Sequence, residues 1–170
     1  MKHIVIVFLI LFSVNMSGQK LTSNVEFIGY KNQVLLAKKG AMKAMGKLNS
    51  GETIRVNCNQ GVCYFEIEYK DRFVRQNIGE DVTILTINEF DFGADGDLEL
   101  VVINDYKGTS YLFIFSYSRG ISQKLFEKEI KNNQVTIKKD YIEYYLSSGL
   151  ESVWNYYLGK FWTMTPFKIE

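Results

Sequence analysis

The residues best suited to chemistry lie in one short stretch, DFGADGDLEL, at positions 91–100. Its acidic side chains alternate with other residues: Asp91, Asp95, Asp97 and Glu99. Side chains at alternate positions of a curled loop can point inward together, and calcium takes about six to eight oxygen ligands, several from carboxylates. Gly96 would permit the sharp bend that such a loop needs. Gly93 offers no side chain, so a water or a backbone carbonyl would have to supply that ligand.

Hydrophobic runs flank this stretch, DVTILTINEF before it and LELVVIND at its end. Both runs predict strands, so the acidic residues belong to a loop that joins two strands at one end of a sheet. Carboxylates crowded together repel one another without a cation, although solvent screens exposed acids. Two interpretations therefore stay open: a loop that binds calcium, and a tight polar turn with no ligand.

The segment DFGADGDLELVVI resembles the calcium loop of FG-GAP and VCBS-type repeats, an integrin-like pattern in which acidic residues and Asp-Gly precede an apolar strand. The resemblance implies side-chain ligands at Asp91, Asp95 and Glu99, and a backbone carbonyl ligand at Asp97. This chain departs from the pattern at Gly93, where Asp or Asn is usual, and at Glu99, which replaces Asp. The resemblance covers residues 82–117 in a single copy, so it does not predict a propeller closed by repetition.

The two cysteines of the chain lie in TIRVNCNQGVCYFEIEY, as Cys58 and Cys63. The flanking residues predict two strands, 54–58 and 63–69, joined by a four-residue hairpin loop in which Gly61 can take a positive φ. Such a hairpin places the two cysteines opposite each other, where their Cβ atoms are close enough to bridge. We therefore expect a structural disulfide, with a pair of free thiols as the alternative.

The N-terminal residues MKHIVIVFLILFSVNMSGQK have the layout of a secretory signal peptide: a basic start, an apolar run and a polar stretch with small residues. We expect cleavage after Gly18, which defines residues 1–18 as signal peptide and places the mature protein in the periplasm or outside the cell. The mature chain of 152 residues (170 − 18) loses Lys2 and retains 19 basic and 19 acidic residues. A neutral chain has no general attraction for nucleic acid or an anionic membrane.

Residues 19–170 are expected to form one β-rich domain. Short apolar or alternating runs recur between turn signals, at 25–30, 82–90, 98–104, 110–117, 135–139, 153–158 and 161–164. The pattern predicts a mainly antiparallel all-β fold, either a β-sandwich or an open propeller-like array of sheets, with at most one short helix. Residues 34–49 resist a strand interpretation, because Ala, Met and Lys favour helix. We interpret them as a surface loop or short helix, with a basic docking face at Lys38, Lys39 and Lys43 as the alternative.

Aromatic residues are concentrated in the last third of the chain: Tyr141, Tyr144, Tyr145, Trp154, Tyr156, Tyr157, Phe161 and Trp162. Aromatic side chains can stack on sugars or fill pockets of a protein partner. In SVWNYYLGKFW, alternation puts Trp154, Tyr156 and Leu158 on one strand face and Tyr157 on the other. We expect the first face to be core and Tyr157 to be partly exposed and available to a partner.

Catalytic groups are scarce in this sequence. The single histidine, His3, leaves with the signal peptide, so the usual general base is missing. A carboxylate pair such as Glu143 with Glu151 could serve a glycosidase, but nothing in its spacing selects it. We therefore expect a non-catalytic, exported binding module, stabilised by one calcium ion, for a protein or glycan partner. The alternative is a periplasmic inhibitor or immunity protein directed at a lysozyme-like cell-wall hydrolase.

Overall fold

The computed structural model describes residues 24–38, 43–106, 109–131 and 133–164. These residues form strands and turns, and no helix occurs among them. The strands are β1 (Asn24–Ile28), β2 (Lys31–Lys38), β3 (Lys43–Lys47), β4 (Thr53–Asn59), β5 (Val62–Tyr69), β6 (Arg72–Glu80), β7 (Ile84–Phe90), β8 (Glu99–Tyr106), β9 (Thr109–Ser118), β10 (Ile121–Glu129), β11 (Gln134–Lys138), β12 (Tyr141–Leu146), β13 (Gly149–Tyr157) and β14 (Lys160–Met164).

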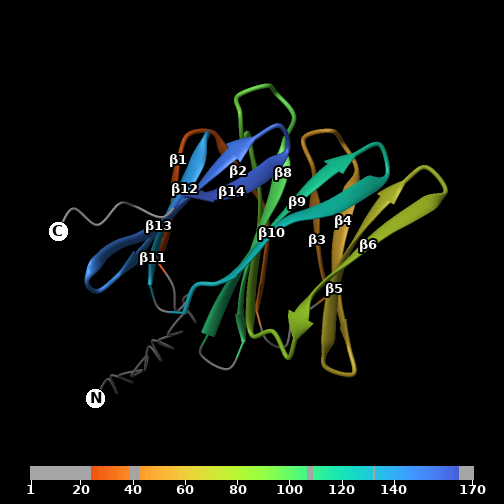
Figure 1. Cartoon of the computed structure of the whole chain (residues 1–170). Coiled ribbons are helices and arrows are strands. Elements are labelled where there is room, and N and C mark those ends of the chain that lie inside the picture. The colour runs from red at the N-terminus through yellow and green to blue at the C-terminus, as the bar shows by residue number, and fades with distance from the viewer. Residues whose placement is uncertain (1–23, 39–42, 107–108, 132, 165–170) are drawn as a thin grey trace, which may run out of the picture.

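The strands form three sheets, which we name by their position. The N-terminal sheet has the order β3-β4-β5-β6, the central sheet β10-β9-β8-β7-β2, and the C-terminal sheet β1-β11-β12-β13-β14. Pairing is antiparallel throughout, except that β1 runs parallel to β11. The central sheet lies between the other two, in a sandwich-like stack of three layers (Figure 1). The all-β, mainly antiparallel prediction is confirmed.

Both faces of β7, β8 and β9, the inner strands of the central sheet, are buried, which explains their continuous apolar runs. Every residue of β7 is buried, because alternate side chains enter different cores. Leu85, Ile87 and Phe115 pack with Ile54, Val56 and Phe65 of the N-terminal sheet. Phe90, Val101 and Ile114 pack with Val135, Ile142 and Trp154 of the C-terminal sheet. Each outer sheet therefore buries one face and leaves its other face to solvent.

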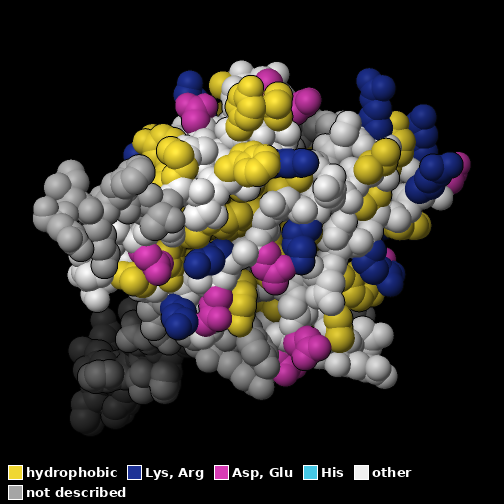
Figure 2. Space-filling model, in the orientation of Figure 1, with side chains coloured by type: hydrophobic (Ala, Val, Ile, Leu, Met, Phe, Trp, Pro, Cys, Tyr) yellow, Lys and Arg dark blue, Asp and Glu magenta, His cyan; other side chains and the backbone are white. Residues whose placement is uncertain are grey.

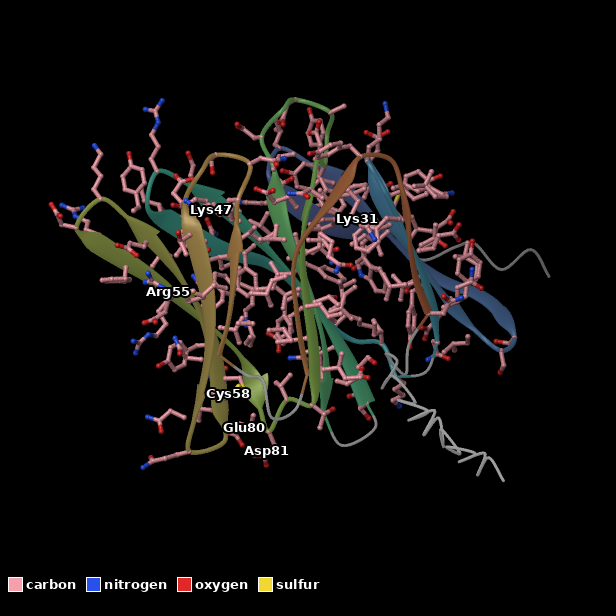
Figure 3. The ribbon with its side chains drawn as sticks, turned by 180° about the vertical axis from the view of Figure 1, so that it is seen from behind. Lys31, Lys47, Arg55, Cys58, Glu80 and Asp81 are labelled. Carbon is pink, nitrogen blue, oxygen red and sulfur yellow. A yellow bond between two sulfur atoms is a disulfide. The ribbon has the colours of Figure 1, made fainter. Side chains whose placement is uncertain are left out.

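The cysteine hairpin forms as the sequence predicts. Cys58 of β4 pairs with Cys63 of β5 in the strand register, and the two residues form a disulfide. Gln60 and Gly61 make the turn, both with positive φ. Figure 3 shows Cys58 at the same end of the molecule as Glu80 and Asp81.

The interpretation of residues 34–49 as a loop or helix is wrong for the described part of that segment. It contributes to two edge strands, β2 and β3. Leu35 and Ala37 alternate with exposed neighbours and enter the core beside the N-terminal sheet. Burial of this alternating face outweighs the small helix preference of the residues themselves.

Candidate functional site

The acidic loop connects β7 to β8 and projects beyond the strand ends (Figure 1). It is closed by its own side chains. The Oδ1 atom of Asp91 accepts a hydrogen bond from the N–H of Gly96 (3.3 Å), and the Oδ1 atom of Asp95 accepts one from the N–H of Asp97 (3.0 Å). The N–H of Gly93 donates to the carbonyl oxygen of Lys139, in the β11–β12 turn of the C-terminal sheet, at 2.7 Å. These bonds hold the loop as a compact polar turn attached to the neighbouring sheet.

Glu99 has a different role from the other acids of the stretch. Its side chain is only 4% exposed, and its carboxylate accepts hydrogen bonds from the hydroxyl of Tyr156 (2.7 Å) and the N–H of Phe92 (3.2 Å). Burial raises the pKa of Glu99 from its usual 4.5 to about 7, while the two hydrogen bonds act in the opposite direction. Burial, together with the bond to Glu99, also raises the pKa of Tyr156. The contact ties the central sheet to the C-terminal sheet.

The predicted calcium ligands are close in sequence but are directed to different partners. Asp91 and Asp95 accept backbone N–H groups of the loop, whereas Glu99 turns toward Tyr156. Among the described residues, no group of three or more His, Cys, Asp or Glu side chains is arranged to hold a metal ion. Calcium binding by these four residues stays a prediction.

A cleft of about 550 Å³ lies beside this loop, between the central and C-terminal sheets. Its walls include Asp95 and Asp97, the β9–β10 turn and the β13–β14 turn. Ile121 and Leu158 line it and are 74% and 81% exposed. Figure 2 shows acidic side chains on both sides of hydrophobic ones at this end of the molecule.

Leu158 has a φ of 51°, a backbone conformation that residues other than glycine rarely adopt. The expectation that Leu158 belongs to the core is therefore wrong, because the chain turns at this residue.

The outer face of the C-terminal sheet carries an unusual set of aromatic side chains. Alternation with the buried Ile142 and Trp154 and the partly buried Phe161 directs their neighbours outward. We define the outer aromatic face by these residues: Lys138, Tyr141, Glu143, Tyr145, Val153, Asn155, Tyr157, Lys160, Trp162 and Met164. Tyr157 and Trp162 are 66% and 58% exposed. The expectation of an inward Trp154 and Tyr156 and an exposed Tyr157 is confirmed.

The polar groups of the outer aromatic face form a connected network. The Nζ of Lys138 donates to the hydroxyl of Tyr141 (3.0 Å) and to Glu143 (3.2 Å), and the hydroxyl of Tyr145 donates to Glu143 (3.0 Å). Lys138 also lies over the ring of Tyr141, 4.8 Å from its centre. The hydrogen bonds to Tyr141 and Glu143 raise the pKa of Lys138, and the bond to Glu143 raises that of Tyr145. Lys138, Glu143 and the two tyrosines are therefore pre-ordered, whereas Lys160 is exposed at the β14 edge of the same face.

The outer face of the N-terminal sheet is different in character. Arg55 pairs with Glu68 at 2.8 Å, and Arg75 pairs with Glu66 while stacking over the ring of Tyr64 at 4.2 Å. Arg55 projects from β4 away from the central sheet, as Figure 3 shows. Pairs of this kind on an exposed sheet are typical of a solvated surface and contribute little stability.

The remaining predicted partner residues are lysines near the first strands. Lys38 ends β2 and Lys43 begins β3. Their side chains and the whole of Lys39 lie outside what the structure describes, so the prediction of a basic docking face there stays a prediction.

Sequence reasoning missed Tyr141, Tyr145 and Trp162 as surface residues. The signal was present as alternation in YIEYYL, where Tyr141, Glu143 and Tyr145 share one face and Ile142 and Tyr144 the other. Alternation alone does not show which of these two faces is covered by the rest of the molecule.

Among the residues described, no helix has the length and apolar character needed to cross a membrane. No protein-family model matches the chain. Comparisons with curated proteins and with solved structures give no match either.

Proposed function

We propose that this chain is an exported, non-catalytic binding module that contacts a protein or glycan partner through its outer aromatic face. The observation that carries the proposal is the contrast between the two outer sheets. Both lie on the same central sheet. The N-terminal sheet exposes paired charges, with Met45 and Phe73 isolated on its two opposite edge strands, whereas the C-terminal sheet exposes Tyr157, Trp162 and Met164 on two neighbouring strands. The buried faces of the two outer sheets supply the packing that stabilises the fold. The exposed aromatic side chains are not needed for that packing and therefore call for another explanation.

Aromatic residues are suited to this task by their chemistry. Tyr and Trp supply a large contact area with few rotatable bonds, and they dominate the energetics of many interfaces. A contiguous exposed apolar patch on a soluble protein marks an interaction surface more often than a single exposed residue does. Trp162 and Met164 lie on β14, an edge strand. Met164 is opposite Val153 of β13, and Tyr157 of β13 is diagonal to Trp162, so the exposed apolar residues lie on two neighbouring strands.

Export is part of the proposal and has two supports. The first is the signal-peptide layout of residues 1–18, which lie outside the described part of the chain. The second is the disulfide between Cys58 and Cys63, because disulfides persist mainly in oxidising compartments.

The test is capture of cell-envelope material from the source cells on immobilised mature protein. We expect Trp162→Ala to reduce the retained material at least about tenfold, the loss typical of a binding hot spot. Phe73→Ala is the matched control, because Phe73 is 59% exposed on the outer face of the N-terminal sheet. Equal retention by wild type and Trp162→Ala would refute the proposal.

The projecting β7–β8 loop favours a second candidate, an inhibitor or immunity protein directed at a lysozyme-like cell-wall hydrolase. Asp95 and Asp97 are exposed at the tip of this closed loop, with Leu158 across the adjacent cleft. A rigid projecting loop can enter the cleft of an enzyme at low entropic cost. Inhibition of cell-wall lysis that is lost in Leu158→Ser and retained in Trp162→Ala would support this candidate over the first.

A further inference from the structure

We propose that the outer aromatic face binds a neutral, β-linked polysaccharide along the direction of its cross-strand rows. This inference rests on the proposed function, and it assigns one chemical class to the partner. The argument uses the strand register, the paired charges and the position of the amide of Asn155.

The register places aromatic and polar groups in a row across the sheet. Tyr141 of β12 pairs with Asn155 of β13, which pairs with Trp162 of β14. Adjacent strands are about 4.8 Å apart, so the two aromatic residues stand about 10 Å apart with an amide between them. That span is close to the length of a disaccharide unit. The row can therefore offer two rings for stacking and one central group for hydroxyl contacts.

A second row provides further polar contacts beside the first. In this second row, Glu143 pairs with Val153, which pairs with Met164. Lys138 pairs with Tyr141 and therefore extends the first row. A carboxylate accepts hydrogen bonds from sugar hydroxyls, and an amide both donates hydrogen bonds to them and accepts hydrogen bonds from them. The existing network fixes Glu143 and Lys138 before any ligand arrives, so binding loses little side-chain entropy.

The charge pattern around the row favours a neutral ligand over a charged one. Lys138 and Glu143 are 3.1 Å apart and neutralise each other, and the exposed Lys160 lies outside the row, opposite Tyr157. An anionic or cationic partner would have to compete with this pair, whereas sugar hydroxyls can bond to both members without separating them. The ion pair of Lys138 and Glu143 keeps further hydrogen-bonding capacity, which suits an uncharged polysaccharide rich in hydroxyl groups.

The shape of the face selects the linkage. The face belongs to a single sheet layer, and Trp162 and Tyr157 project from its surface. In β-linked glucose and N-acetylglucosamine polymers the ring substituents are equatorial, so each sugar presents a flat face of C–H groups. Such a face matches an exposed aromatic ring. An α-1,4-linked glucan, such as the amylose of starch, winds into a helix and offers no extended ribbon for a row of this kind.

The experiment measures retention of the mature protein on microcrystalline cellulose, on chitin and on granular starch. We expect retention on at least one of the two β-linked polymers and none on starch. Trp162→Ala should weaken binding about tenfold or more, and Phe73→Ala should bind as wild type does. Far-UV circular dichroism and thermal melts check that both variants are folded, which we expect because both side chains are exposed.

Intrinsic fluorescence gives a second readout on soluble cello- and chito-hexasaccharides. The chain has two tryptophans, of which Trp154 is 8% exposed and Trp162 is 58% exposed. Binding should change the emission of wild type, and Trp162→Phe should remove this change because the remaining Trp154 is buried. Glu143→Gln, which keeps the shape of the side chain and breaks the ion pair, should weaken binding less than Trp162→Ala.

The outcomes separate this inference from the function on which it rests. No retention on either β-linked polymer, or equal retention of wild type and Trp162→Ala, overturns the polysaccharide assignment. If capture of envelope material still depends on Trp162 in that case, the face binds a protein and the proposed function stands. If neither assay depends on Trp162, both proposals are wrong.

Discussion

Replacing Glu99 with glutamine should remove a pH-dependent part of the protein's stability. Glu99 is buried between the central and C-terminal sheets, and burial raises its pKa from 4.5 to about 7. Between these two values the unfolded chain has released the proton and the folded chain still holds it. Unfolding therefore releases a proton, and rising pH favours the unfolded state. The stability associated with protonated Glu99 is fully present below about pH 4.5 and is lost as the pH rises through 7.

The size of the effect follows from the two pKa values. Each pH unit corresponds to about 1.4 kcal/mol, so the free energy of unfolding should fall by about 3 kcal/mol across this window. Glutamine carries no titrating proton, and its amide can donate to the hydroxyl of Tyr156 while its oxygen accepts the N–H of Phe92. Glu99→Gln should therefore match wild type near pH 4.5 and exceed it by about 3 kcal/mol above pH 7.

The assay is urea unfolding of wild type and Glu99→Gln at intervals from pH 4.5 to 8. Other titrating groups cancel in the difference between the two proteins, and Glu129→Gln, at an exposed position of β10, controls for the loss of one carboxyl group. Tyr156→Phe gives a further check, because it removes a hydrogen bond that lowers the pKa of Glu99 and should move the window to higher pH. A difference that is constant from pH 4.5 to 8 would refute the reasoning.

Three further predictions concern the disulfide, the calcium loop and the N-terminus. Thiol titration of the denatured, unreduced protein should find no free thiol, and reduction of Cys58 and Cys63 should cost roughly 2 kcal/mol because the closed loop is short; two free thiols would contradict this. If the loop binds calcium, 10 mM calcium should raise the melting temperature by roughly 3 to 6 °C over chelator, and Asp95→Ala should abolish the rise; identical wild-type melts would identify the loop as a turn only. Mass analysis of exported protein should find a mature N-terminus near Gln19, and an intact Met1 would exclude cleavage.

Local signals in the sequence were sufficient for the β4–β5 and β13–β14 hairpins and for several strands. The NQGV turn predicts both the β4–β5 hairpin and the pairing of Cys58 with Cys63, because a short loop leaves one register in which they face each other. Gly159 similarly marks the β13–β14 turn. These features depend on residues a few positions apart, and such contacts are readable from one sequence.

Features that depend on the stacking of sheets could not be read in this way. Residues 34–49 contain helix-favouring side chains, and only the core beside the N-terminal sheet makes them strands. Strands β6, β10 and β12 were not predicted, since their polar, outward residues weaken the apolar pattern. Which face of such a strand is polar and solvent-exposed can be assigned only when the sheet that covers its other face is known.

The same distinction between local signals and contacts across sheets applies to the candidate sites. The sequence predicts the position of the acidic loop between two strands, and the structure confirms that position. It does not predict the contact between Glu99 and Tyr156, which are 57 residues apart and lie in different sheets. Alternation correctly predicts that Trp154 is buried, but the sequence does not predict that Trp162 is exposed.

Oxidative footprinting of Trp162 in the bound state tests the central claim most directly. Mature protein is exposed to hydroxyl radicals alone and after binding to envelope material of the source cells, and oxidation at each aromatic residue is measured by mass spectrometry. Trp162 and Tyr157 are exposed on the outer aromatic face, and Phe73 is exposed to a similar extent on the opposite outer sheet. We predict that binding protects Trp162 and Tyr157 several-fold and leaves Phe73 unchanged. Protection of Phe73 with no change at Trp162 would contradict the account.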